Sequence, residues 1–235
     1  MISTRAVTLF AQIVLTYSSI NSNVQMTAFW MMVYILQDPY ALDNIRAEIA
    51  SIMETLQARE GLSGPITARL TTQDFITSCP LLNSAFNETL RVASTGSSIR
   101  EVTRTVHVRD KILTKGTQVI LPHRQLLMAE EAFGHDAKET DLARFAKDKS
   151  LERHPYYKPF GGGVTLCTGR FLGKREVLAF VALALWRYDF HVIQRGEEAL
   201  GVKGMATPRL DEAKPSLGVS KQVEGDDMIV SVKQR

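Results

Sequence analysis

The feature that most constrains this chain is a glycine-rich stretch that ends in a single cysteine at the start of a helical pattern. Three consecutive glycines, Gly161–Gly163, follow Phe160, and Cys167 precedes an apolar pattern that begins at Arg170. Consecutive glycines let the backbone approach a flat partner closely and adopt conformations that other residues resist. Unpaired N–H groups and the dipole at a helix start favour the thiolate form of a nearby cysteine. Gly169 leaves room there for a large cofactor, so the stretch predicts a cofactor-binding loop.

The residues around Cys167 bear on three other interpretations of this cysteine. A phosphate-binding loop is excluded, because Gly169 and Gly173 are one residue too close together for that motif. A nucleophilic cysteine would need a histidine partner such as His154 or His191, and no family signature supports either. A buried structural cysteine is the usual fate of a lone Cys, and it stays open at this point.

Composition limits the classes of protein to which this chain can belong. The chain has 235 residues, 45% of them hydrophobic, which is enough for one large domain with a core. The net charge is only +3 and no basic stripe occurs, so no nucleic-acid partner is expected. Cys79 and Cys167 form neither a disulfide framework nor a zinc pattern, which fits a reducing compartment. The five histidines are scattered, so a metal held by side chains alone is not expected.

Hydrophobic periodicity and turn residues divide the chain into helices and short strands. Asp38-Pro39 ends the first helix and starts the second, because proline suits a first helical turn and not a helix interior. Alternating Val, Ile and Thr predict strands around a turn at Gly116. Because strands and helices do not alternate, an α+β fold, mostly α, is predicted. The expected elements are helices over 3–36, 39–58, 80–91 and 170–186, a loop over 61–68, strands within 94–121, an irregular stretch over 123–166 and two short strands in the tail.

The N-terminal segment allows two interpretations. The apolar pattern of residues 1–20 resumes at Met26 and continues through Leu36, which predicts one long buried helix with a polar middle. No uninterrupted apolar run reaches the length of about 18 residues expected of a membrane span, so no anchor is expected in this chain. A secretory signal peptide over residues 1–20 is the alternative.

The glycine-rich stretch resembles the haem-ligand loop of the cytochromes P450. The family's pattern F-x-x-G-x-x-x-C-x-G is met by Phe160, Gly163, Cys167 and Gly169, and Gly161 lies within the same loop. The resemblance implies that Cys167 is the axial thiolate ligand of haem b (iron protoporphyrin IX). It also implies the fold of the C-terminal half of a P450: a long central helix, helices J to L, small β-sheets, a meander and the haem-binding loop.

Further pieces occur in the order that the family has. Glu88 and Arg91 match the E-x-x-R pair of its helix K, and at this spacing they share one helix face. Arg144, in the sequence LARF, resembles the meander arginine that completes a buried network with this pair. Arg100 matches the family's haem-propionate arginine, and a guanidinium suits a carboxylate bidentately. A solvated strand residue is the alternative for Arg100.

The central helix departs from the family's pattern. The acid and the alcohol that usually deliver protons to bound oxygen are replaced by Asn23 and Val24, and valine cannot donate a hydrogen bond. Asn23 and Ser22 are therefore the candidates for orienting a water. A similar asparagine occurs in the branch that contains sterol 7α-hydroxylases and prostacyclin synthase, and the sequence AFW after it also looks like that branch. In the haem loop, Thr165 stands where the family usually has a basic residue, which leaves Arg100 more responsible for the propionates.

The resemblance implies reductive activation of O₂ at haem iron, with the thiolate favouring O–O cleavage. It implies a lipophilic, sterol- or terpenoid-like substrate and electrons from an NADPH-dependent reductase. Full-length relatives associate with the cytoplasmic face of the endoplasmic reticulum membrane, and the general similarity is to fungal members. Residues 1–235 are expected to be a single partial P450 domain without its N-terminal half. The alternatives are a non-catalytic haem-binding fragment and a peroxide-rearranging isomerase that needs no proton relay.

Overall fold

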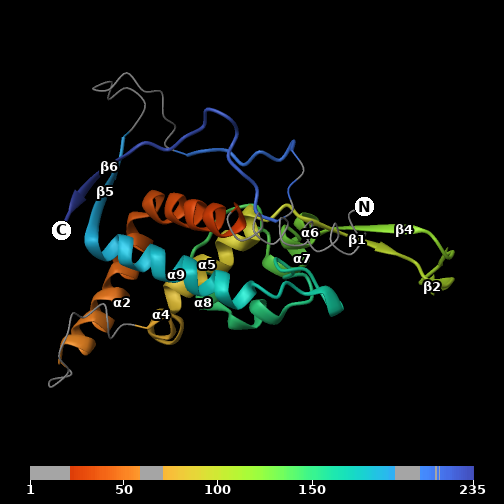
Figure 1. Cartoon of the computed structure of the whole chain (residues 1–235), viewed down its shortest axis with the longest axis horizontal. Coiled ribbons are helices and arrows are strands. Elements are labelled where there is room, and N and C mark those ends of the chain that lie inside the picture. Colours follow the sequence, from red (N-terminus) through yellow and green to blue (C-terminus); the bar gives the residue numbers. More distant parts are fainter. Residues whose placement is uncertain (1–21, 59–70, 194–206, 215, 217) are drawn as a thin grey trace, which may run out of the picture.

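The computed structural model describes residues 22–58, 71–193, 207–214, 216 and 218–235 (Figure 1). Helices dominate, and the strands form small antiparallel pairs, so the predicted α+β fold class is confirmed. In chain order, a helix over residues 22–37 is followed by α2 (Pro39–Ala58), α4 (Thr72–Ser78), α5 (Pro80–Ala93), β1 (Ser97–Glu101), β2 (Val106–Val108), β3 (Lys111–Leu113), β4 (Gln118–Pro122), α6 (His123–Leu127), α7 (Glu130–Phe133), α8 (Arg144–Lys147), the 3-10 turns η1 (Lys149–Arg153) and η2 (Gly163–Thr165), α9 (Arg170–Arg187), β5 (Tyr188–Val192) and β6 (Val230–Gln234).

The main core lies where the 22–37 helix, α2, α4, α5 and α9 pack together (Figure 1). Its largest fully buried side chain is Trp30, whose indole N–H donates to the carbonyl of Ser220 at 2.7 Å. This bond satisfies the one polar atom of the ring and attaches the C-terminal segment to the first helix. The other large and fully buried apolar members are Met31, Ile35, Ile45, Ile49, Met53, Phe75, Leu82 and Leu178.

Side-chain carboxylates bind the backbone amides at the starts of α2 and α5. The carboxylate of Asp38 accepts the amide of Ala41 at 2.9 Å, so the residue that interrupts the chain before Pro39 also caps α2. Glu48 on α2 accepts the amides of Leu81 and Leu82 at 2.8 and 3.1 Å, which satisfies the start of α5. Burial raises the pKa of Glu48, and these two hydrogen bonds oppose the rise.

The strands form three separate pairs. β1 runs antiparallel to β4 with Ser97 opposite Pro122, and β2 pairs with β3 beyond them. Together these strands extend away from the helical body (Figure 1). β5 continues directly from α9 and pairs with β6, with Tyr188 opposite Gln234. The strands predicted within 94–121 are confirmed, and β6 confirms the last strand of the tail.

Several predictions need correction or lie outside the described residues. Short helices and 3-10 turns occupy much of the stretch 123–166, which the sequence predicted to be irregular. Each is too short to show a helical period in the sequence, and their side-chain and backbone contacts hold them in place. The helix α4 was not predicted, although Asp74 accepts the amide and hydroxyl of Thr71 at its start. The predicted loop 61–68 and the alternatives for residues 1–20 lie outside the described residues.

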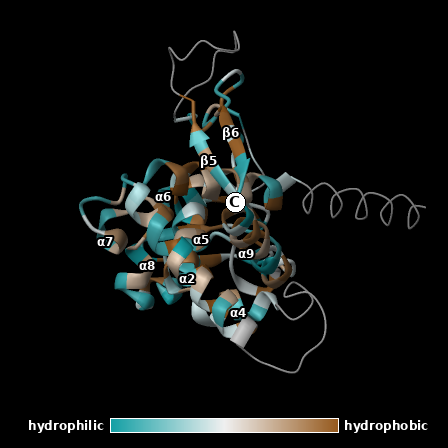
Figure 2. Cartoon of the chain, turned by 90° about the vertical axis from the view of Figure 1, so that its left-hand side faces the viewer, coloured by the Kyte–Doolittle hydropathy of each residue, from teal (hydrophilic) through white to brown (hydrophobic). Residues whose placement is uncertain are grey.

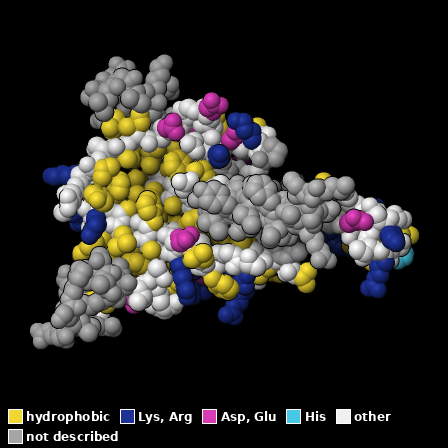
Figure 3. Space-filling view, viewed as in Figure 1, with side chains coloured by type: hydrophobic (Ala, Val, Ile, Leu, Met, Phe, Trp, Pro, Cys, Tyr) yellow, Lys and Arg dark blue, Asp and Glu magenta, His cyan; other side chains and the backbone are white. Residues whose placement is uncertain are grey.

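Hydrophobic side chains gather on the face of the molecule shown in Figure 3, over the region of the 22–37 helix. None of the helices in the described part of the chain combines the length and the apolar character that a membrane crossing requires.

The core packing of α9 generates a stability prediction. Leu178 is fully buried on this helix, whereas Leu172 on the same helix is half exposed. We expect Leu178→Ala to lower the free energy of unfolding by about 2–5 kcal/mol, because a cavity remains where the side chain was removed. Leu172→Ala is the matched control and should change it by less than about 0.5 kcal/mol. Urea unfolding of both variants measures the difference, and equal losses would contradict this packing.

Candidate functional site

The cysteine loop folds back on itself through its own backbone. The amide of Cys167 donates to the carbonyl of Phe160 at 3.1 Å, which closes the loop, and the amide of Leu166 donates to Gly163 at 3.4 Å. Gly161 and Gly163 have φ values of 76° and 69°, in the left-handed region that favours glycine. These two glycines are therefore required by the turn that presents the cysteine.

Cys167 is exposed at the start of α9. Arg170, the first residue of the helix, donates from Nη1 to the carbonyl of Cys167 at 2.7 Å, so the cysteine is fixed relative to the helix start. A Cβ added at Gly169 would lie 3.9 Å from the Cys167 sulfur, an ordinary contact that leaves the thiol accessible. Cys79 differs, because it is buried in the core and burial raises its pKa to about 12. Cys167, and not Cys79, is thus placed to act as a ligand.

Several residues close to Cys167 in the sequence have exposed apolar side chains. Phe160 is half-buried and packs against the main core, which anchors the beginning of the loop. The side chains that follow it are exposed although they are apolar: Val164, Leu166, Phe171 and Leu172. A thiol beside exposed apolar side chains and an open glycine backbone is typical of a site that binds a flat apolar group.

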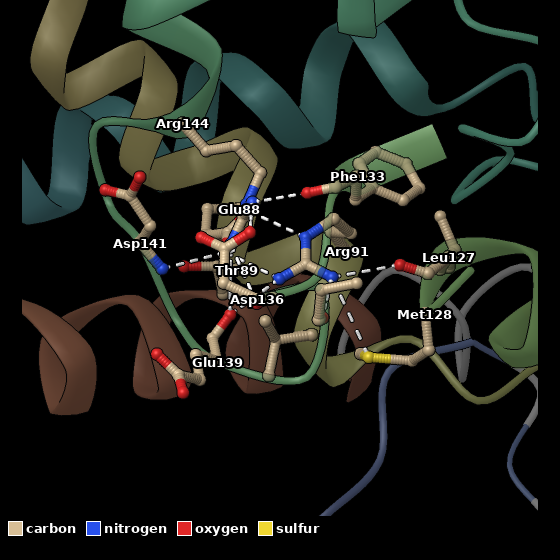
Figure 4. Close-up of polar contacts among 12 residues, drawn as sticks. Glu88, Thr89, Arg91, Leu127, Met128, Phe133, Asp136, Glu139, Asp141 and Arg144 are labelled. Carbon is tan, nitrogen blue, oxygen red and sulfur yellow. Dashed lines mark hydrogen bonds and ion pairs between the residues drawn. The ribbon is translucent and has the colours of Figure 1, made fainter. Parts of the chain in front are cut away.

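A buried charge network lies on α5 next to the segment that precedes the loop (Figure 4). Arg91 donates from Nε and Nη2 to the two carboxylate oxygens of Glu88 at 2.8 and 2.7 Å, and both side chains are fully buried. Arg144 lies 3.3 Å from the same carboxylate through Nε, and the amide of Asp141 donates to it at 2.9 Å. The structure therefore brings together the three residues that the sequence predicted as a network.

The two guanidinium groups also bind backbone carbonyls of the segment 127–139. Arg91 donates to Leu127 at 3.0 Å and to Glu139 at 2.9 Å, and Arg144 donates to Phe133 at 2.7 Å. Arg144 further pairs with Asp136 at 3.0 Å, and this hydrogen bond lowers the pKa of the Asp136 carboxyl. The network thus fixes an irregular segment against α5.

A second apolar cluster continues from this network toward the loop. Phe133 and Phe145 are buried in it, and Tyr157 donates its hydroxyl to the carbonyl of Asn87 on α5 at 3.1 Å. The amide of Ala146 donates to the hydroxyl of a second α5 residue, Ser84, at 2.9 Å. The segment that leads to Phe160 is therefore attached to α5 along its length.

Arg100 lies on β1 and is exposed, and its Nη1 donates to the carbonyl of Ile99 at 2.9 Å. Close to it is His123, which the sequence reasoning missed because it stands in the strand-to-helix turn and matches no metal or catalytic spacing. Its Nε2 is 2.6 Å from the hydroxyl of Ser98, and its Nδ1 is buried with no hydrogen-bond partner among the described residues. Burial, aided by the positive charge of Arg100, lowers the pKa of His123.

Asn23 binds the C-terminal segment. Its side-chain oxygen accepts the amide of Val219 at 3.2 Å, and its backbone carbonyl accepts the hydroxyl of Thr27 at 2.7 Å. A Cβ added at Gly218 would lie 2.6 Å from that oxygen, so a side chain there would displace the Asn23 carboxamide. No pattern in the sequence pointed to Gly218 as a partner of Asn23. Ser22 is half-buried on the same helix.

The site is thus an exposed thiol at a helix start, in a loop closed by a glycine turn. Comparison with known proteins agrees: the family model for Cytochrome P450 matches residues 22–209. The chain belongs to the cytochrome P450 family, whose members are haem proteins.

Individual relatives support the same assignment. A cytochrome P450 monooxygenase of Gibberella zeae is 28% identical over 79% of this chain and 36% of its own length. Prostacyclin synthase of Rattus norvegicus is 26% identical over 79% of this chain and 39% of its own. The 25-hydroxycholesterol 7-alpha-hydroxylase of the same species is 32% identical over 70% of this chain and 42% of its own. The chain therefore spans roughly two fifths of the length of these relatives.

The residues around Cys167 fit a haem. Nothing would lie within 4 Å of a Cβ at Gly161 or Gly163, so the loop backbone is open to a flat group. Within the described ranges, no three His, Cys, Asp or Glu side chains gather as a metal site. In the cytochrome P450 family a cysteine thiolate binds the haem iron, and Cys167 is the residue of this chain that would supply it.

The buried network generates the second prediction. Glu88→Gln leaves two buried guanidinium groups without their shared carboxylate, so we expect the free energy of unfolding to fall by about 3–5 kcal/mol. Lys147→Met removes the exposed ion pair between Lys147 and Asp141 and should cost at most about 1 kcal/mol. Chemical denaturation of both variants makes the comparison, and a loss for Glu88→Gln no larger than for Lys147→Met would contradict the network's role.

His123 generates a prediction on pH. Because its pKa is lowered in the folded state, the unfolded state binds more protons below the ordinary histidine pKa of 6.5. The stability contribution of a neutral His123 is therefore complete above that pH and is lost progressively as the pH falls below it. His123→Gln should flatten the dependence of the urea midpoint on pH between about 6.5 and 5. An unchanged slope would show that other groups cause it.

Proposed function

We propose that this chain is the haem-binding part of a haem-thiolate monooxygenase, with Cys167 as the axial ligand. The observation that carries the proposal is the exposed thiol of Cys167 at the start of α9, in a loop closed by glycines with positive φ. Haem b, when bound, supplies the reductive activation of O₂ that such enzymes use. The chain's own residues bind and orient that group.

Each residue of the loop has a distinct part in this proposal. Cys167 provides the thiolate, and the amide-to-carbonyl bond between Cys167 and Phe160 fixes the position of the sulfur. Gly161, Gly163 and Gly169 keep the loop backbone free of side chains where the flat group would lie. With the flat group bound, the exposed apolar side chains beside the loop would be covered and would help to exclude water from the thiolate.

The charged residues have two roles in this proposal: one would bind the haem, and the others position the cysteine loop. Arg100 would hold a propionate, and its exposed place on β1 leaves its guanidinium accessible to a carboxylate. Glu88, Arg91 and Arg144 act as positioning residues, because they hold the segment that leads into the loop. Their effect on the haem is transmitted through that segment.

Proton delivery is assigned to Asn23 and Ser22. Val24 has no hydroxyl, and the side-chain oxygen of Asn23 already accepts the amide of Val219. This bond orients the carboxamide, so that its nitrogen can donate to a water on the other side. Ser22, next to it on the same helix, provides a hydroxyl that can bind the same water.

For the complete protein we propose a lipophilic, sterol- or terpenoid-like substrate and electrons from an NADPH-dependent reductase. A relative that is named as a hydroxylase of 25-hydroxycholesterol supports the substrate class. The hydrophobic face over the 22–37 helix is consistent with a lipophilic substrate (Figure 3). We propose the cytoplasmic face of the endoplasmic reticulum membrane as the location.

The ligand is tested by the ferrous–CO absorption spectrum of the chain reconstituted with haem. We expect a Soret band at the red-shifted position of a thiolate ligand, because Cys167 is the exposed cysteine. Cys167→Ser should remove that band, and Cys79→Ala, which changes the buried cysteine, should keep it. A band at the imidazole-like position in the unsubstituted chain would refute Cys167 as the ligand.

Turnover separates the proposed function from its rivals. With haem, a reductase and NADPH, the complete protein should hydroxylate a sterol such as 25-hydroxycholesterol. Conversion of an endoperoxide without a reductase would instead identify an isomerase. Haem uptake with no turnover of either substrate would identify a non-catalytic haem-binding protein.

A further inference from the structure

A cavity of about 630 Å³ lies at the far end of α9, where α2, α9 and β6 meet. This end of the molecule faces the viewer in Figure 2, with β5 and β6 beside the end of α9. Its walls include Arg46 and Ile49 from α2, Leu185 to Arg187 from α9, and Arg235 after β6. The volume is in the range of pockets that hold a small organic ligand.

Positive charge is in excess around this cavity. Arg46 pairs with Asp189 at 3.0 Å, and Arg235 approaches the same carboxylate oxygen at 3.4 Å. Arg187 is exposed and forms no ion pair within the described part of the chain. Three guanidinium groups thus lie around the cavity and one carboxylate pairs with two of them, so the electrostatics of the cavity favour an added anion.

Arg46 has unused hydrogen-bonding capacity. Its Nη2 donates to the carbonyl of Tyr188 at 3.0 Å as well as binding Asp189. Its Nε is buried and has no hydrogen-bond partner among the described residues. A buried donor without a partner carries a free-energy cost that an acceptor from a ligand would remove.

Apart from Gln234, the remaining walls are apolar. Ala47 is exposed, Ala50 and Trp186 are half-buried, and the other two apolar residues of the wall, Ile49 and Leu185, are fully buried. A guanidinium rim above an apolar wall matches a molecule with an acidic head and a hydrocarbon body.

We propose that this cavity binds an amphiphile with an acidic headgroup, either a carboxylate or a phosphate. The headgroup lies among Arg46, Arg187 and Arg235, and the apolar body lies against Ala50 and Trp186. The site is separate from the thiolate loop, because the length of α9 places Arg187 roughly 25 Å from the helix start. It stands independently of the proposed haem chemistry.

The test is calorimetric titration of the full chain with decyl phosphate below its micelle concentration. We expect one site, and we expect Arg187→Gln to weaken binding at least about tenfold, since one charge-assisted contact is lost. Arg187 is exposed, so this variant should fold normally. Arg104→Gln, an equal charge change on an exposed residue after β1, is the matched control and should bind as the unsubstituted chain does. Equal weakening by both variants, or no binding, would overturn the proposal.

Two further arms identify the apolar requirement and the source of the ligand. Inorganic phosphate alone should bind much more weakly than decyl phosphate, and equal binding would refute the role of the apolar wall. Phosphatidylcholine vesicles with and without phosphatidylglycerol are then compared. Sedimentation with the anionic vesicles that depends on Arg187 would support a lipid headgroup as the source. Binding of decyl phosphate without such sedimentation would support a free amphiphile.

Discussion

The buried carboxylate of Glu88 joins α5 to the segment that leads to the cysteine loop. Two guanidinium groups, Arg91 and Arg144, and a backbone amide converge on it, and the side chains of Glu88 and Arg91 have no exposed surface. Charges buried in this way are stable only when they are fully hydrogen-bonded. Here the remaining donors bind carbonyls of a segment with little regular structure, so the electrostatic requirement of one carboxylate organises the chain that leads to Cys167.

The sequence predicted the parts of the fold that depend on local periodicity. The helices that became α2, α5 and α9 were placed within two residues of their ends, because apolar spacing and Pro39 or Pro80 define them. The short helices between residues 123 and 166 could not be predicted, since contacts with distant side chains and not their own pattern hold them in place. α4 was missed because its seven residues are too few to show a period.

In the candidate site too, features set by a local pattern could be predicted, and features set by distant contacts could not. The loop from Phe160 to Gly169 could be predicted because its spacing is fixed by its own backbone turn. The convergence of Glu88 and Arg144 came from the family resemblance, since no local pattern connects residues so far apart in the chain. The sequence could not single out His123. Its lowered pKa depends on burial and on the nearness of Arg100, which only the folded chain shows.

The contact between Asn23 and Gly218 has a consequence for how sequences of this family can diverge. The first described helix and the C-terminal segment meet so closely that a carbon atom added at Gly218 would lie 2.6 Å from the side-chain oxygen of Asn23. A side chain at Gly218 would displace the carboxamide of Asn23, and the hydrogen bond from the amide of Val219 would then be lost. The two positions are thus expected to change together over evolutionary time, as one inherited unit.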